Sequence, residues 1–328
     1  MSEHIVITNH WQFNELGKAN LSDLRFGFMG SRPMDTIVVT DIIPNQEQFE
    51  AVFEIGKICG EYHQVKWLYS SARENIDSLM EAYNLREDGL ISMPSNPVDC
   101  YRYFNRADAL FHAIIASAKC FIDKAELLLK SRFGESSESF SRWKSITSKS
   151  YDSSLVYALL YDLRNHVEHD FWTISLVNHN VTTREAGLAI NIDNDLFGLK
   201  LKKPLRTRLC EWSEKRAKSG ETAWLSLGKC ASTYREMLTV LYVIFLSDYT
   251  DSATQCVERC RKELDAIPGN LLIWDGKEAC AYSATGQRRA YHIAETSFPS
   301  SLKKELDLLE DYLKTFMRPD EKRNHIVK

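Results

Sequence analysis

The stretch Asp152–Asn178, DSSLVYALLYDLRNHVEHDFWTISLVN, decides the fold. On a helical wheel, at about 100° per residue, its apolar side chains gather in one stripe. An amphipathic stretch of this length predicts one long helix over 152–178 that buries a face against other helices. The stripe consists of Val156, Leu160, Leu163, Val167, Phe171 and Ile174.

The opposite side of this predicted helix is not simply polar. Asn165 and His169 are four residues apart and share a face. Tyr161, Trp172 and Leu176 lie at helical spacing from that pair. An apolar second side needs a cover, and a symmetric partner is the simplest one, so we expect a homodimer.

Outward from this stretch, the chain is predicted to be mainly α, an antiparallel helical bundle with small α/β additions at both ends. We expect an N-terminal α/β region at 1–98, the bundle at 99–267 and a C-terminal extension at 268–328. Besides the central helix, the pattern predicts a strand at Thr36–Ile43, short strands within Val181–Ile192 and around LLIWDG and ACAYSA, and helices at 45–60, 61–85, 105–132, 222–248, 252–266 and 300–316.

Composition excludes several classes of protein. The 328 residues carry a net charge of −4, which argues against a basic protein that coats nucleic acid. The longest apolar run, Met237–Leu246, is too short to span a bilayer, and the N-terminus lacks a secretion-signal pattern. Eight cysteines without a C-x-x-C pair are typical of free thiols in a reducing cytoplasm. We therefore expect a cytoplasmic protein without a metal or cofactor.

The central stretch carries one group of residues with catalytic chemistry, Arg164, Asn165 and His169. A histidine titrates near neutrality and can act as the acid or the base in RNA cleavage without a metal. A guanidinium can stabilise the negative charge of the phosphorane-like transition state. Asn165 can hydrogen-bond the phosphate or orient His169. The neighbours His166, Glu168 and Asp162 are candidates for supporting these side chains.

The pattern Arg164-Asn165-x3-His169 within a helical bundle resembles the signature of HEPN-domain ribonucleases. The resemblance covers 99–267 and implies a metal-independent RNA endonuclease whose active site is composed at a homodimer interface. It also implies a role in toxin systems, abortive infection or antiviral defence, with a possible antitoxin or sensor partner. Some HEPN domains act only as binding modules, so a non-catalytic interaction or regulatory module remains the alternative.

A basic segment follows the central stretch. Between Gly198 and Gly220 there are eight basic and two acidic residues, a charge of +6 in an acidic chain. With Trp212 among the charges, the segment is a candidate RNA-binding surface, although a solvated helix face has the same composition. The candidate RNA-binding residues are Lys200, Lys202, Lys203, Arg206, Arg208, Lys215 and Arg216.

Other interpretations of the same residues stay open. Arg164 and Glu168 are spaced as an i,i+4 ion pair on a solvated helix surface. His166 and His169 are spaced like metal ligands, but no third ligand is evident. Asp108, His112 and Lys119 lie off the apolar stripe of the predicted helix 105–132, and one of them could line a cleft.

Overall fold

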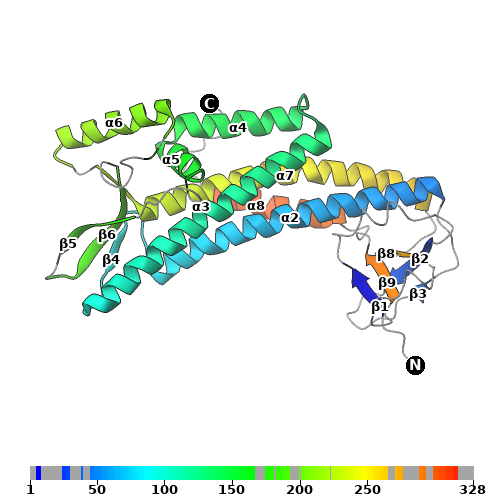
Figure 1. Ribbon diagram of the computed structural model, residues 1–328. Helices are drawn as coiled ribbons and strands as arrows, with labels where there is room; N and C mark the ends of the chain where they lie inside the picture. The colour runs from blue at the N-terminus through cyan, green and yellow to red at the C-terminus, as the bar shows by residue number, and fades with distance from the viewer. Residues whose placement is uncertain are drawn as a thin grey trace. The chain divides into compact units, whose positions relative to one another are not determined.

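The computed structural model is mainly helical (Figure 1), which confirms the predicted fold class. Its contacts divide the chain into two compact units. The bundle unit comprises residues 65–245 and 310–328, and the terminal unit comprises 1–64 and 246–309. The structure describes residues 5–8, 24–29, 38–39, 45–166, 174–180, 182–192, 199, 201–221, 223–264, 270–275, 288–292 and 298–316.

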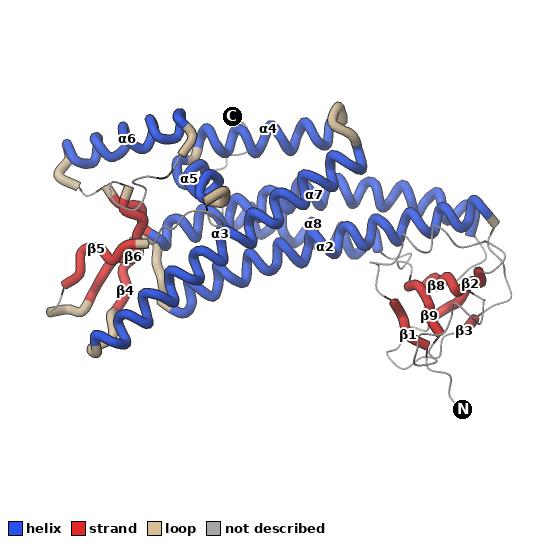
Figure 2. The backbone as a smooth tube through the Cα atoms, in the orientation of Figure 1, coloured by secondary structure: helices blue, strands red, loops and turns tan. Residues whose placement is uncertain are grey.

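Three long helices form the centre of the bundle unit, and they lie side by side in Figure 2. Tyr69 of α2 stacks on Tyr242 of α7 with ring centroids 4.1 Å apart and also contacts Phe121 of α3 at 5.6 Å. All three rings are almost completely buried, so they supply much of the apolar contact that holds these helices together. The helices are α2 (Gln46–Ala82), α3 (Pro97–Phe133) and α7 (Leu227–Leu264).

The helix boundaries follow capping residues in the sequence. The Asn96 side chain accepts from the N–H of Val98 at the start of α3, and Pro97 occupies the first turn. Gly134, at φ 91°, ends α3 as the sequence predicts. Serine side chains then cap α4 (Glu138–Ser153) from Ser137 and α5 (Leu155–Leu163) from Ser154.

The predicted helix over 152–178 is wrong in its extent. Ser154 interrupts it at φ −110°, α5 ends at Leu163, and residues 175–180 form strand β5. The apolar spacing of Leu176 and Val177 fits a strand as well as a helix, and pairing with β6 decides between them. Because Leu176 lies on a strand, the continuous second helix face predicted to bind a symmetric partner does not exist.

A small sheet closes one end of the bundle unit. Strand β6 pairs with β5 along one edge and with β4 and β7 along the other. At Gly187 a Cβ would lie 2.9 Å from the Trp224 ring, so only glycine lets these strands approach. The strands are β4 (Leu90–Ser92), β5 (Ser175–Asn180), β6 (Glu185–Asn191) and β7 (Trp224–Ser226), and helix α6 (Lys203–Lys218) lies between β6 and β7 in the chain. Only β6 lies within 181–192, where the sequence predicts a hairpin, and its partner β5 precedes that range.

The terminal unit combines both ends of the chain in one sheet. Its strand order is β1-β9-β8-β2-β3, with β1 parallel to β9 and the other pairs antiparallel. The regions 1–98 and 268–328, which the sequence treats as separate additions, therefore share hydrogen bonds. The elements are β1 (Ile5–Thr8), β2 (Leu24–Met29), β3 (Val38–Val39), β8 (Asn270–Asp275), β9 (Arg288–His292) and α8 (Phe298–Phe316).

The terminal unit is also tied together by tyrosine hydroxyls. Tyr249 of α7 donates to Glu61 of α2 at 3.0 Å, and Tyr62 of α2 donates to Glu305 of α8. In the described part of the chain, no helix is both long and apolar enough to cross a membrane.

Candidate functional site

Helix α5 ends in a tightened turn at Arg164, Asn165 and His166, which we call the RNH turn. The N–H of Arg164 still donates to the Leu160 carbonyl at 3.1 Å. The next two N–H groups donate to carbonyls only three residues back, at 3.0 and 2.8 Å. Such bonds are typical of a last helical turn. The turn leaves Asn165 exposed and His166 half-buried.

The Arg164 side chain is held between a ring and a carboxylate. Its Cζ lies 3.7 Å from the centroid of the Tyr161 ring, and its Nη1 lies 3.2 Å from Oδ1 of Asp123 on α3. Only 10% of the side chain is exposed. Its buried Nε and Nη1 make no hydrogen bond with the residues that the structure describes. Arg164 is therefore fixed by electrostatic and cation–π contacts.

Asp123 is shared between two cations. Its Oδ2 accepts a hydrogen bond from Lys119 Nζ at 3.1 Å, while its Oδ1 faces Arg164. The Asp123 side chain is 47% exposed, so its carboxylate reaches solvent. Two positive charges and one negative charge leave this group with a net charge of +1.

Two buried phenols lie beside Arg164. Tyr157 of α5 and Tyr234 of α7 have ring centroids 6.2 Å apart, and neither is accessible to solvent. Burial raises the pKa of both phenols well above the ordinary value, and the positive charge of Arg164 opposes that rise. Their hydroxyls have no hydrogen-bond partner among the described residues. Both phenols are therefore neutral at any physiological pH.

Asp162 anchors the start of the basic helix α6. Its Oδ2 accepts from the N–H of Lys202 at 2.9 Å, and Lys202 Nζ lies 3.4 Å from its Oδ1. Lys202 Nζ also lies 5.1 Å from the centroid of the Tyr161 ring. Arg164 and Lys202, 38 residues apart in sequence, thus contact the same aromatic ring.

Tyr151 completes this anchor. Lys202 Nζ lies 5.2 Å from its ring centroid, and Arg208 Nη1 donates to its carbonyl at 2.8 Å. Burial, and after it the Asp162 charge, raises the pKa of Tyr151 to about 12. Arg208 therefore has a packing role that the sequence does not reveal.

The other candidate RNA-binding residues occupy different environments. Arg216 pairs with Glu221 at 3.0 Å and lies 5.1 Å from the Trp212 ring. Lys200 lies outside the described residues. The exposed members of the predicted set are Lys202, Lys203, Arg206 and Lys215.

Two further predicted residues, Glu168 and His169, lie outside the described residues. After residues 167–173, the N–H of Ile174 donates to Asp108 Oδ1 at 2.9 Å. His112 Nε2 lies 3.7 Å from the same oxygen. Helix α3 therefore holds the chain on both sides of residues 167–173.

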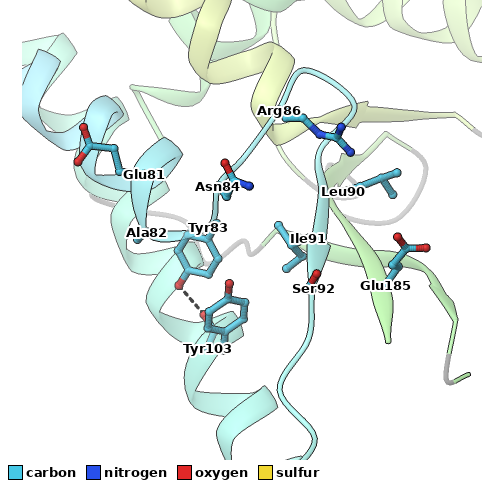
Figure 3. Close-up of a pocket in the computed structure, with 10 residues that line it drawn as sticks. All are labelled: Glu81, Ala82, Tyr83, Asn84, Arg86, Leu90, Ile91, Ser92, Tyr103 and Glu185. Carbon is cyan, nitrogen blue, oxygen red and sulfur yellow. Dashed lines mark hydrogen bonds between the residues drawn. The ribbon is translucent and has the colours of Figure 1, made fainter. Parts of the chain in front are cut away.

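A separate pocket of about 360 Å³ lies where α2 ends, near β4 (Figure 3). Tyr83 donates its hydroxyl to the Tyr103 carbonyl at 2.7 Å, and burial raises the pKa of Tyr83 to about 12. Carboxylates of Glu81 and Glu185 also line the pocket. None of the predicted catalytic or RNA-binding residues lines it.

Sequence reasoning missed the contacts that α3 and α7 make with the RNH turn. Asp123 and Tyr234 carry no motif, and each lies at least 40 positions from Arg164 in the chain. The only local signal is the i,i+4 spacing of Lys119 and Asp123 on a predicted helix. Within the described ranges, no three His, Cys, Asp or Glu residues are arranged to hold a metal ion.

Comparison with known proteins adds no identification. No protein-family model matches the chain, and no curated protein or solved structure is found to be similar to it. The HEPN resemblance therefore rests on Arg164, Asn165 and His169 alone.

Proposed function

We propose that this chain is a metal-independent RNA endonuclease of the HEPN type. One observation carries the proposal: Arg164 and Lys202 contact the same Tyr161 ring, so the catalytic motif and the basic segment meet at one place. A nuclease needs such a meeting, because the phosphates on both sides of the cleaved bond require cations near the catalytic groups.

The proposed reaction uses the 2′-hydroxyl of RNA as its nucleophile. His169 removes the proton, the 2′-oxygen bonds to phosphorus, and the bond from phosphorus to the 5′-oxygen breaks. The leaving 5′-oxygen takes a proton from a histidine, and the products are a 2′,3′-cyclic phosphate and a 5′-hydroxyl. Arg164 stabilises the charge that develops on the phosphoryl oxygens, and Asn165, exposed beside it, binds the same phosphate.

The test is RNA cleavage in EDTA by the wild type and two variants. Arg164→Ala and His169→Ala should each lower the cleavage rate by at least about 100-fold. Arg142→Ala and His63→Ala remove the same residue types from exposed positions on α4 and α2 and should leave cleavage unchanged. Activity that requires added metal, or that survives in His169→Ala, would contradict the proposed mechanism.

The alternative, a non-catalytic interaction or regulatory module, is favoured by the burial of Arg164. An arginine with only 10% of its side chain exposed and a carboxylate partner resembles a structural residue. This alternative predicts no cleavage of any RNA and a loss of stability in Arg164→Ala. Measuring cleavage and thermal unfolding on the same samples separates the two functions.

Two copies of the chain are part of the proposal, since one RNH turn supplies a single arginine and a single motif histidine. Support for the homodimer comes from the resemblance to HEPN ribonucleases, because the helix face predicted to hold a partner is interrupted. A cytoplasmic location, a defence or toxin role and an antitoxin or sensor partner belong to the same proposal. The described cysteines are free thiols, as a reducing compartment would keep them.

A further inference from the structure

Three side chains on α3 and at the end of α5 form a small cluster next to the RNH turn. Lys119 Nζ and Arg164 Nη1 approach the two oxygens of one carboxylate, that of Asp123, at 3.1 and 3.2 Å. Two cations on separate oxygens of a single anion are the arrangement that binds a phosphate group. The Asp123 carboxylate therefore occupies the position that a phosphate would take between the two cations.

The charges of this cluster favour the binding of an anion from solvent. With Lys119 and Arg164 positive and Asp123 negative, one positive charge is not compensated within the cluster. The two neighbouring pairs are balanced, since Lys202 lies against Asp162 and Lys144 lies against Glu126. The side chains of Lys119 and Asp123 are 30% and 47% exposed, so solvent reaches the cluster from the α3 side.

We propose that Lys119 and Arg164 form a binding site for an RNA phosphate, and that Asp123 is an internal carboxylate which a phosphate displaces. A phosphodiester carries the same unit negative charge as Asp123 and offers two unesterified oxygens, one for each cation. The choice of an RNA phosphate as the ligand rests on the proposed function. The site adds Lys119 and Asp123 to the residues that the motif supplies.

If a phosphate displaces Asp123, substitutions of Asp123 and Lys119 should have opposite effects on RNA binding. Removing the Asp123 charge frees both cations and should strengthen RNA binding. Removing the Lys119 charge takes away one phosphate contact and should weaken binding. A general effect of surface charge on RNA binding would be the same for neighbouring charged residues. The adjacent ion pair of Glu126 and Lys144 therefore provides a matched control.

The experiment measures the dissociation constant of a short mixed-sequence 2′-O-methyl RNA by fluorescence anisotropy, in EDTA and at several salt concentrations. This RNA lacks the nucleophilic hydroxyl and is not cleaved. Asp123→Asn should bind about fivefold more tightly than the wild type, whereas Glu126→Gln should change binding by less than about twofold. The gain should be much smaller in Asp123→Asn/Arg164→Ala, because Arg164 is one of the two cations that the substitution frees.

Lys119→Gln tests the same site without disturbing the buried Arg164. It should bind about fivefold more weakly and lower the salt slope of log Kd by about 0.7, while Lys144→Gln changes both much less. If Asp123→Asn fails to fold, this pair of lysine variants decides the outcome. Equal effects in Lys119→Gln and Lys144→Gln, or Asp123→Asn binding no better than Glu126→Gln, would overturn the inference.

The two proposals fail in different ways. If the variants bind RNA in the expected pattern but the protein cleaves no RNA, the nuclease proposal is wrong and the phosphate-site proposal stands. If cleavage depends on Arg164 and His169 but the Asp123 and Lys119 variants bind RNA like their controls, the phosphate-site proposal is wrong and the nuclease proposal stands.

Discussion

Two arginines of the bundle unit each lie near a tyrosine ring and an aspartate, yet they are held in different ways. Arg73 of α2 donates from Nη1 to the hydroxyls of Tyr69 and Thr239 at 3.0 and 3.3 Å. Arg164 makes no side-chain hydrogen bond with described residues and relies on Asp123 and a ring. An arginine that donates to neutral hydroxyls keeps those partners, whereas one held by a ring and a half-exposed carboxylate can exchange that carboxylate for another anion.

The largest expected difference between the two arginines is in RNA cleavage. Arg164→Lys keeps the charge but loses the planar guanidinium that lies over the Tyr161 ring and that, in the proposed nuclease, contacts the phosphate. We expect its cleavage rate to fall by about 100-fold or more, with Arg73→Lys close to the wild type. Single-turnover kinetics measure the cleavage rates of both variants. Equal losses of rate would show that the two arginines do not differ in their role in cleavage.

The second difference concerns stability. Arg73→Ala removes donors from two buried hydroxyls and should lower the free energy of unfolding by about 2 kcal/mol. Arg164→Ala should cost about half as much, because Asp123 is half exposed and regains water. Urea unfolding followed by circular dichroism measures both, and a larger loss in Arg164→Ala would favour the structural role of that arginine.

The third prediction concerns the anchor that brings α6 to the Arg164 region. Asp162 is 2% exposed and accepts from the backbone N–H of Lys202, so Asp162→Ala leaves that N–H unbonded. We expect a loss of about 1.5 kcal/mol and faster hydrogen exchange in residues 202–210. Exchange measured by mass spectrometry should show no change in α2, where Arg73 lies; a change there would mean that the two arginines are coupled.

The smallest expected effect is the pH dependence that the buried phenols add. Folding raises the pKa of Tyr157 and Tyr234, so above pH 10 the unfolded chain loses phenol protons that the folded protein keeps. Their contribution to stability is complete below about pH 10 and decreases as the pH rises further. Between pH 8 and pH 11, the free energy of unfolding should fall by about 1.4 kcal/mol less in Tyr157→Phe than in the wild type. Urea unfolding at both pH values measures this, and equal losses would show that the phenol ionises normally.

The sequence predicts those elements whose signals are local. The helix ending at Gly134 and the helix over 300–316 are confirmed, because their signals lie within a few turns of the chain. Of the hairpin predicted within 181–192, only the strand β6 lies in that range, because its partner β5 belongs to the stretch predicted to be helical. The predicted helices 45–60 and 61–85 are one continuous helix, α2, since nothing between them breaks the backbone.

The site was less predictable than the fold. Arg164, Asn165 and Lys202 were identified from their chemistry, but their surroundings depend on α3 and α7, which no spacing in the sequence connects to them. The end of α5 at Leu163 is not predicted, because the apolar period in the sequence continues through Ile174, whereas the N–H groups of Asn165 and His166 bond to carbonyls only three residues back. Tertiary contacts with Asp123 and Asp108 of α3 hold the chain at Arg164 and at Ile174, before and after residues 167–173.

The pairing of β1 with β9 has a consequence for synthesis on the ribosome. Strand β9 is made about 280 residues after β1, and β8 is made about 240 residues after β2. The early strands must wait, with unpaired edges, until nearly the whole chain has emerged, whereas residues 65–245 can fold in between. A chain released before residue 270 would keep residues 65–245 of the bundle unit. It would leave β1 without its partner β9, and the β2–β3 pair without β8, open to aggregation and proteolysis.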